Sequence, residues 1–245
     1  MTAKKRLDVL LFERGLAPSR ARAQSMILAG KVVVDGAPVT KAGSQVATDA
    51  SIELHAQDHP YVSRGALKLE AALDAFGISP EGMDCLDVGA STGGFTDLLL
   101  ARGARRVIAV DVGRGQLAWR LRQDPRVVVM EGVNARHLAE HSLPFVVGLA
   151  CVDVSFISLR LVVPAVLPHL EAGGWLICLV KPQFEAARDQ VGSGGVVRDE
   201  EVRREVIDGT VAALADLGPT LLGIVASPIR GPKGNLEELA VFRNS

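Results

Sequence analysis

One lysine lies at the end of a strongly apolar stretch. In "WLICLVKP", Lys181 follows a predicted buried strand, where an ammonium group is costly unless it is paired or functional. Three candidate neighbours are Lys68 in an earlier predicted helix, Asp153 at another strand end and Glu237 in a predicted hairpin. A partly desolvated lysine beside a second cation can accept a proton near neutral pH. These four side chains therefore predict a site that takes a proton from a hydroxyl group.

A second chemical feature is the glycine-rich turn "LDVGASTGGFTD", residues 86–97. Because glycine lacks the Cβ that blocks close approach, such a turn brings backbone N–H groups close to a ligand. A dinucleotide site has the pattern GxGxxG and an acidic residue about 20 positions later. Asp111 fits the acidic position, but the glycine spacing differs and Asp87 would repel a diphosphate.

S-adenosylmethionine suits this turn better, because it carries an ammonium group, a carboxylate and a ribose diol but no phosphate. Asp87 can attract the cationic amino-acid part, and Asp111 can hold the ribose. We therefore expect S-adenosylmethionine as the cofactor. The residues predicted to bind it are Asp87, Gly89, Ala90, Ser91, Thr92, Gly93, Gly94, Asp111, Val112, Asn134 and Asp153.

The elements that position these residues alternate between apolar, β-rich runs and helical patterns. Runs such as "RVIAVDV" and "VVGLACVDV" predict an α/β fold with a mostly parallel sheet covered on both faces. Ligands of such sheets bind at the carboxyl ends of the strands, where the candidate residues fall. The final segments "TLLGIVASPI" and "LEELAVF" flank the turn-rich "RGPKGN" and predict a hairpin. A sheet closed in this way is typical of Rossmann-like class I methyltransferases and unusual for dehydrogenases.

The start of the chain predicts a small α+β domain over residues 1–59. Ser19 is the expected N-cap of its second helix, and Gly30 fits that helix's C-cap. "KVVVDGAPV" predicts a strand, a turn at Asp35-Gly36 and a second strand, and "SIEL" predicts a further short strand. Residues 60–63 are the expected linker to a domain over 64–245, whose first helix is expected to be capped by Ser63.

Charge and composition narrow the function classes. The net charge of −1 argues against a globally basic nucleic-acid binder, although residues 1–60 carry eight Lys/Arg and six Asp/Glu. Within them, Arg20 and Arg22 stand near a helix N-terminus, where a positive charge opposes the helix dipole and suggests a use other than stability. No segment predicts a membrane span or an export signal, and three cysteines in apolar runs favour a cytoplasmic protein. No metal-ligand pattern stands out, so we expect no metal.

The order "RLDVLL…GLAPSRARAQSMILAGKVVVDGAPVTKAGSQV…DASIEL" closely resembles the RNA-binding domain named for ribosomal small-subunit protein four. In that family the SRxxA helix and the turn after it meet the RNA backbone. The resemblance therefore implies phosphate contacts by Arg6, Arg20, Arg22 and Lys31.

Over its whole length the chain resembles the TlyA (haemolysin A) family of rRNA 2′-O-ribose methyltransferases, whose catalytic domain is similar to FtsJ/RrmJ. The resemblance rests on "YVSRGALKLEAAL", "LDVGASTGGFTD", "DVGRGQLAWRLRQDPRV", "VDVSFISL", "LVKPQFEAARDQVGSGGVVRD" and "GNLEELAVF". It implies a cytidine target in ribosomal RNA, ribosomal subunits as partners, and a catalytic tetrad of Lys68, Asp153, Lys181 and Glu237. In the implied roles Lys181 takes the proton and Lys68 lowers the proton affinity of Lys181. Asp153 fixes Lys181 and the methyl donor, and Glu237 is the outer support.

Some positions and readings stay open. Glu238 neighbours Glu237, and the GNxE pattern selects Glu237. The family tends to have a basic residue and threonine where this chain has Gly132-Val133, and often a lysine where it has Ser193. Alternative functions are a membrane-active haemolysin, which would need a membrane-active segment, and a ribosome-assembly factor that binds RNA without catalysis.

Overall fold

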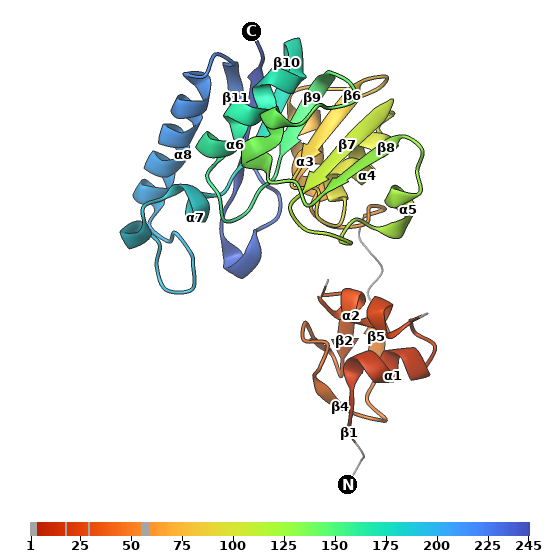
Figure 1. Cartoon of the computed structure of the whole chain (residues 1–245). Helices are drawn as coiled ribbons and strands as arrows, with labels where there is room; N and C mark the ends of the chain where they lie inside the picture. Colours follow the sequence, from red (N-terminus) through yellow and green to blue (C-terminus); the bar gives the residue numbers. More distant parts are fainter. Residues whose placement is uncertain (1–3, 18, 29, 55–58) are drawn as a thin grey trace. The chain divides into compact units, whose positions relative to one another are not determined.

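The computed structural model describes residues 4–17, 19–28, 30–54 and 59–245, which form two compact units, residues 1–60 and 61–245 (Figure 1). Tyr61 is buried in the core of the second unit. Residues 61–63, assigned to a linker from the sequence, therefore belong to that unit. Residues 55–58 of the predicted first domain lie outside the described residues.

The first unit packs two helices against short strands around one apolar core. Its helices are α1 (Leu7–Glu13) and α2 (Arg20–Leu28). One sheet joins β2 (Val32–Val34) to β3 (Ala37–Pro38) and β5 (Ile52–Leu54), and another pairs β1 (Lys4–Arg6) with β4 (Gln45–Ala47). The sequence did not predict β1 or β4, because three residues are too few to show an alternating pattern.

The turn chemistry expected in this unit is confirmed. Ser19 Oγ accepts a hydrogen bond from Arg22 N at 3.1 Å, and Gly30 adopts φ +69° just after α2. Asp35 and Gly36 have φ of 50° and 78°, and positive φ at both central residues is the geometry of a tight two-residue hairpin.

The second unit is built on one seven-stranded sheet. Its strands are β6 (Asp84–Val88), β7 (Arg106–Asp111), β8 (Val127–Glu131), β9 (Val147–Val152), β10 (Leu170–Val180), β11 (Thr220–Ala226) and β12 (Glu238–Arg243). Their spatial order is β11-β12-β10-β9-β6-β7-β8. β12 is reversed and pairs antiparallel with both β10 and β11, whereas β10, β9, β6, β7 and β8 pair in parallel. The predicted parallel sheet closed by a hairpin is thus confirmed.

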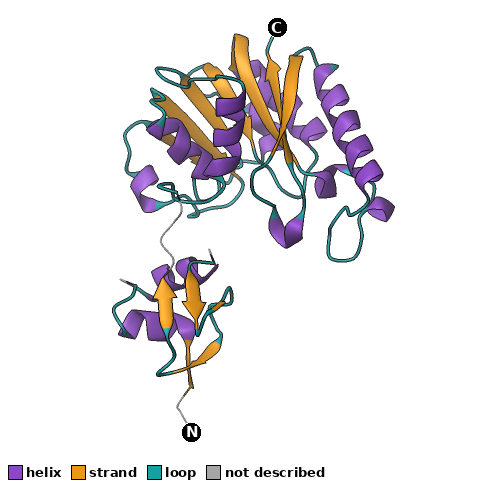
Figure 2. Ribbon diagram, turned by 180° about the vertical axis from the view of Figure 1, so that it is seen from behind, coloured by secondary structure: helices purple, strands orange, loops and turns teal. Residues whose placement is uncertain are grey.

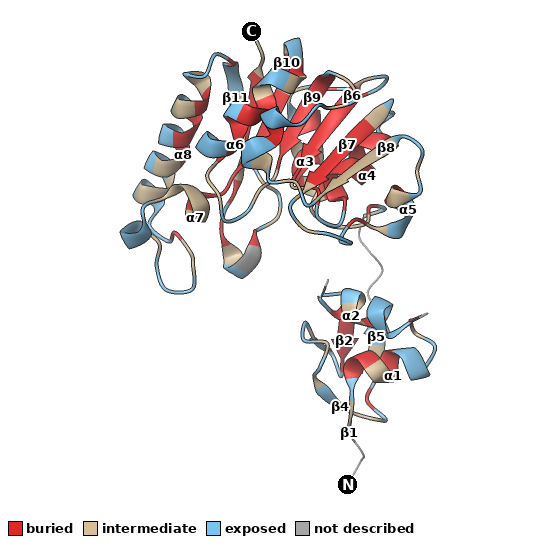
Figure 3. Ribbon diagram, viewed as in Figure 1, coloured by how far each residue is buried: buried red, intermediate tan, exposed pale blue. Residues whose placement is uncertain are grey.

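Helices cover both faces of this sheet (Figures 1 and 2). One apolar layer includes α3 (Ala66–Ala75), α4 (Gly94–Ala101) and α5 (Trp119–Arg122), and the other includes α6 (Leu159–Val166) and α8 (Glu200–Ala215). Neighbouring strand residues face opposite layers, so the central strands β6 and β9 are buried along their whole length (Figure 3). The remaining helical turns are α7 (Pro182–Glu185), η1 (Ala135–Glu140), η2 (Leu167–His169), η3 (Arg188–Gln190) and η4 (Pro232–Gly234).

Two predicted helices differ from expectation. Ser63 does not cap α3, which begins at Ala66; its Oγ instead accepts a hydrogen bond from Gly65 N at 3.2 Å and supports the turn before the helix. The apolar spacing of "GQLAWRLRQ" predicts a further helix, but the segment forms only the single turn α5. Ala118 N donates to Thr92 O at 3.1 Å, which ties the chain before α5 to the glycine turn and delays the start of the helix.

Candidate active site

The four tetrad candidates come from four elements that meet at one edge of the sheet. Asp153 and Lys181 directly follow the parallel strands β9 and β10, so both lie at carboxyl ends. Glu237 directly precedes β12; because β12 is reversed, its start lies beside the end of β10, where Val180 pairs with Glu238. Lys68 reaches the same edge from α3.

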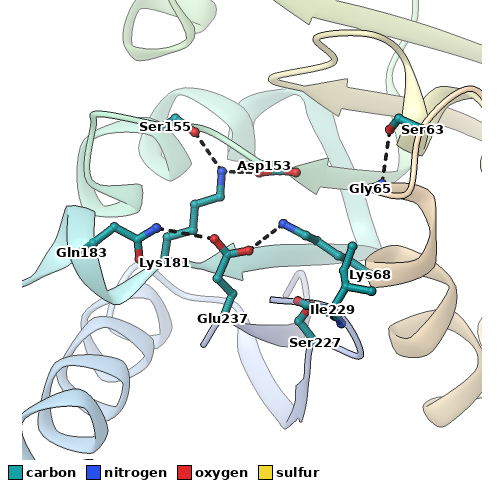
Figure 4. A network of polar contacts seen from close by, with 10 residues as sticks. All are labelled: Ser63, Gly65, Lys68, Asp153, Ser155, Lys181, Gln183, Ser227, Ile229 and Glu237. Carbon is teal, nitrogen blue, oxygen red and sulfur yellow. Dashed lines mark hydrogen bonds and ion pairs between the residues drawn. The ribbon is translucent and has the colours of Figure 1, made fainter. Parts of the chain in front are cut away.

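The structure brings the four side chains together as two ion pairs (Figure 4). Lys68 Nζ lies 2.6 Å from Glu237 Oε2, and Lys181 Nζ lies 2.5 Å from Asp153 Oδ1. Both lysines are 8% exposed and Glu237 is 2% exposed. Each buried lysine Nζ thus has a carboxylate partner, which offsets the cost of its desolvation. Of the two adjacent glutamates, Glu237 is the one that contacts Lys68.

Sequence reasoning missed three residues that contact the tetrad. Lys181 Nζ donates to Ser155 Oγ at 2.9 Å, and Gln183 Nε2 donates to Glu237 Oε1 at 3.5 Å. A Cβ on Gly231 would lie 2.0 Å from Glu237 Oε1, so only glycine leaves room for that carboxylate. The signal for Ser155 was its position two residues after Asp153, a spacing that puts side chains on one side of an extended segment. Gln183 lies inside α7, and no such spacing indicated it.

Phe156 is a further residue that the sequence analysis passed over. Its side chain is 90% exposed and its backbone has φ +65°, a left-handed conformation that is uncommon for a bulky residue. The ring centroid lies 5.0 Å from that of Phe184, whose ring is in turn 6.0 Å from Lys181 Nζ. An aromatic surface therefore faces solvent next to the buried lysine.

The glycine-rich turn leads from β6 into α4 and needs its glycines for packing. Gly89 has φ +88°, and a Cβ there would stand 2.2 Å from the carbonyl oxygen of Asp153. Gly93 has φ +95°, and a Cβ there would stand 2.3 Å from Leu121 Cδ1. The turn thus lies against the end of β9, directly beside the residue that holds Lys181.

Asp87 ends up fully buried under this turn. Its Oδ2 accepts hydrogen bonds from Thr96 N at 2.9 Å and Thr96 Oγ1 at 2.6 Å, whereas its buried Oδ1 has no partner in the described part of the chain. The pKa of Asp87 is raised to about 7, chiefly by burial; the nearby charges of Asp153 and Asp111 also raise it, and the Thr96 hydrogen bonds lower it. Three acidic groups at neighbouring strand ends suit a cationic ligand.

The other cofactor candidates lie at or after the carboxyl ends of neighbouring strands and in the glycine-rich turn. Asp111 accepts hydrogen bonds from Ser91 N and Gly113 N, both at 2.7 Å, which fixes its carboxylate at the end of β7. Val112 follows it and is 71% exposed. Asn134 lies three residues beyond β8, where its side chain caps η1 by accepting from Arg136 N. Ala90, Ser91, Thr92 and Gly94 complete the turn between β6 and α4.

Comparison with known proteins shows which family the chain belongs to. A model of the FtsJ-like methyltransferase family matches residues 61–244, and a model of the S4 domain matches residues 5–52. The 16S/23S rRNA (cytidine-2′-O)-methyltransferase TlyA of Mycobacterium tuberculosis is 48% identical over 97% of this chain and 89% of its own length. The chain belongs to the TlyA family of FtsJ-like methyltransferases.

Two further TlyA-like proteins match along nearly the whole chain. Hemolysin A of Brachyspira hyodysenteriae is 42% identical over 97% of this chain and 99% of its own length. A solved structure from Streptococcus thermophilus whose name carries the word hemolysin superposes with a TM-score of 0.77 at 42% identity, covering 100% of this chain and 90% of that one. Among the residues of this chain that the structure describes, no helix is both long enough and apolar enough to cross a membrane. Over the same residues, no group of histidine, cysteine and acidic side chains is arranged to hold a metal ion.

In the S4 domain of this TlyA-family chain, the four residues predicted to contact RNA lie in two groups of two. Arg6 Nε and Nη2 each donate to the carboxylate of Asp8 at 3.0 Å, and Arg20 Nη2 approaches it at 3.4 Å. Arg22 and Lys31 form the second pair: partial burial lowers the pKa of Lys31, and the charge of Arg22 lowers it further. Arg6 is thus held by a carboxylate rather than free in solvent.

Asp8 is completely buried and also accepts from Gln24 Nε2 at 2.7 Å, which links α1 to α2. The hydrogen bonds from Arg6 hold the pKa of this carboxyl well below its usual range, despite burial. A depressed carboxyl pKa contributes stability that is present above about pH 4 and is lost as the pH falls through the folded-state value. We expect Asp8→Asn to accelerate amide hydrogen exchange in α1 and α2 about tenfold at pH 7, because the charge-assisted bonds are lost.

The matched control for this experiment is Glu13→Gln, which breaks the Lys5–Glu13 pair in the same domain, where both side chains are more than 40% exposed. Exposed pairs contribute little, so exchange in α1 and α2 should stay close to wild type. Equal exchange in the two variants would contradict the role given to Asp8.

Proposed function

We propose that this protein transfers the methyl group of S-adenosylmethionine to the ribose 2′-hydroxyl of a cytidine in ribosomal RNA, in the cytoplasm. The observation that carries the proposal is the pair of buried Lys–carboxylate contacts next to the glycine turn. The relative named for this reaction and the S4 domain support ribosomal RNA as the substrate.

Lys181 is the proposed proton acceptor. Bound S-adenosylmethionine would supply the methyl group, whose bond to sulfur breaks and leaves a neutral thioether as the bond to the 2′-oxygen forms. The hydroxyl proton passes to the neutral amine form of Lys181 Nζ, and Asp153 and Ser155 then hold the resulting ammonium group. Lys68 and Glu237 form a second buried ion pair, which supports the position of Lys181. The exposed ring of Phe156 offers a stacking surface for the base of the target nucleotide.

The cofactor supplies an electrophilic methyl group on a sulfonium cation. We assign the cationic part to the carboxylates of Asp87 and Asp153 and the ribose diol to Asp111, with Val112 beside the adenine. Backbone groups of Gly89, Ala90, Ser91, Thr92, Gly93 and Gly94 line the same crevice, and Asn134 closes it. The buried, unpartnered Oδ1 of Asp87 supports a ligand that brings a positive charge.

Incubation of the protein with isotopically labelled S-adenosylmethionine and isolated small or large ribosomal subunits tests the proposal. We expect label in RNA, resistant to alkaline cleavage at a single ribose, because 2′-O-methylation removes the nucleophile for strand scission. Label on a base would exclude ribose methylation. No label in either subunit, although the protein binds the cofactor, would favour an RNA-binding assembly factor.

Cofactor binding should depend on pH through Asp87. Its raised pKa, about 7, means that ionising this carboxyl lowers folding stability between about pH 4 and 7. A cationic ligand favours the ionised form of Asp87. As the pH increases towards 7, we expect the affinity for S-adenosylmethionine to increase by up to about tenfold per pH unit, and above pH 7 to level off. Calorimetry in two buffers of different ionisation enthalpy at pH 6 should detect proton release on binding.

Asp87→Asn is the control for this titration, because the amide can still accept from Thr96 but cannot ionise. The variant should bind more weakly at pH 8 and lose most of the pH dependence between pH 6 and 8. A pH profile that is unchanged in Asp87→Asn would assign the titration to another group.

A further inference from the structure

Two short segments at the active-site edge of the sheet contact each other at three successive places along the chain. Residues 153–159 follow β9, and residues 181–185 follow β10. At the first place, Lys181 Nζ contacts Asp153 and Ser155. At the second, the rings of Phe156 and Phe184 lie 5.0 Å apart. The third contact depends on Glu185, which the mechanism above does not use.

Glu185 accepts hydrogen bonds with both carboxylate oxygens. Its Oε2 accepts from Ser158 Oγ at 2.6 Å, and its Oε1 accepts from Leu159 N at 2.8 Å. Ser158 is itself the N-cap of α6, so the carboxylate lies at the positive end of that helix. Burial raises the pKa of Glu185 even though these hydrogen bonds lower it. The residue therefore fastens the end of the first segment to the end of the second.

The segment held in this way contains strained backbone. A left-handed conformation at a bulky residue such as Phe156 persists only where the surroundings impose it. The Phe156 side chain is 90% exposed, so burial of its own ring supplies little of that restraint. The polar anchors on its two sides are the Lys181 contacts and the Glu185 contacts.

We propose that Glu185 is a positioning residue for methyl transfer. By fixing residues 158 and 159, it holds Ser155 on Lys181 Nζ and keeps the Phe156 ring beside the lysine. The inference rests on the proposed function, because it assumes that Lys181 is the reacting group. Its consequence is that loss of the hydrogen bonds made by Glu185 lowers the catalytic rate without weakening cofactor binding, since these bonds go to Ser158 and Leu159 and not to the glycine turn.

Glu185→Ala, Glu185→Gln and Ser158→Ala test this in the full-length protein. With ribosomal subunits as substrate, Glu185→Ala should lower kcat about ten- to hundredfold, the loss expected for removing charge-assisted hydrogen bonds, and leave the Kd for S-adenosylmethionine within about twofold. Glu185→Gln should restore kcat to near wild type, because its amide can accept from Leu159 N and donate to Ser158 Oγ. Ser158→Ala should add little to Glu185→Ala, since both remove the same contact.

The matched control is Asp124→Ala. Asp124 also accepts a backbone N–H, that of Arg126 at 2.9 Å, and side-chain donors, but it precedes β8 at the opposite edge of the sheet. It should leave kcat unchanged. A second measurement, hydrogen exchange of residues 153–159, should accelerate in Glu185→Ala and not in Asp124→Ala.

The possible outcomes separate the two proposals. An active wild type with wild-type kcat in Glu185→Ala would overturn the positioning role, as would equal losses in Glu185→Ala and Asp124→Ala. A wild type that methylates no ribose would overturn the proposed function instead. In that case the exchange measurement still decides, and unchanged exchange of residues 153–159 in Glu185→Ala would overturn the positioning role.

Discussion

Replacing Lys181 by alanine is expected to lower methyl transfer to ribosomal RNA by at least 10²–10⁴-fold, roughly the contribution of a positioned proton acceptor. The affinity for S-adenosylmethionine should stay within about twofold, because Lys181 Nζ contacts Asp153 and Ser155 rather than the glycine turn. Single-turnover rates with saturating cofactor, measured beside calorimetric cofactor binding, separate these two effects.

Lys181→Arg is the informative companion variant. The guanidinium group keeps the positive charge and can still pair with Asp153, but it remains protonated and so cannot accept the hydroxyl proton. It should therefore be nearly as inactive as Lys181→Ala. Wild-type turnover in Lys181→Arg would mean that this position supplies only charge, and the proton would need another acceptor.

The second large effect is expected on stability. Glu237→Ala should lower the free energy of unfolding by about 3–5 kcal/mol, because it leaves the ammonium group of Lys68 buried without its partner. Lys68 and Glu237 are 8% and 2% exposed, so solvent offers little compensation. Urea unfolding of the full chain, followed in the larger unit through Trp119 and Trp175, measures this loss.

The double variant Lys68→Met/Glu237→Leu should recover most of that stability, because it removes both charges and fills the space with apolar side chains. It should remain inactive if the pair shapes the pocket around Lys181. Methyl transfer at the wild-type rate in the double variant would remove Lys68 and Glu237 from the proposed machinery. A loss in Glu237→Ala below about 1 kcal/mol, the value of an exposed pair, would contradict the burial argument.

Much of this architecture is determined by local features of the sequence. The alternation of apolar strands with helical patterns predicts the parallel sheet, and Asp35-Gly36 predicts the hairpin of the first unit, because both depend on residues close together in the chain. Position at strand ends, together with the family resemblance, also indicated Asp87, Asp111, Asp153 and Lys181. Each of these lies at or next to the carboxyl end of a strand, as parallel strands require.

The tertiary structure alone decided which of these side chains are partners. Lys68 and Glu237 are 169 positions apart, and they meet because β12 is reversed and begins beside the end of β10. The sequence suggested that the four side chains lie close together, and the fold decides which carboxylate each lysine contacts. Gln183, Gly231 and Glu185 carried no distinctive local pattern. Their roles arise from contacts between loops, which depend on the order and direction of strands in the sheet rather than on spacing along the chain.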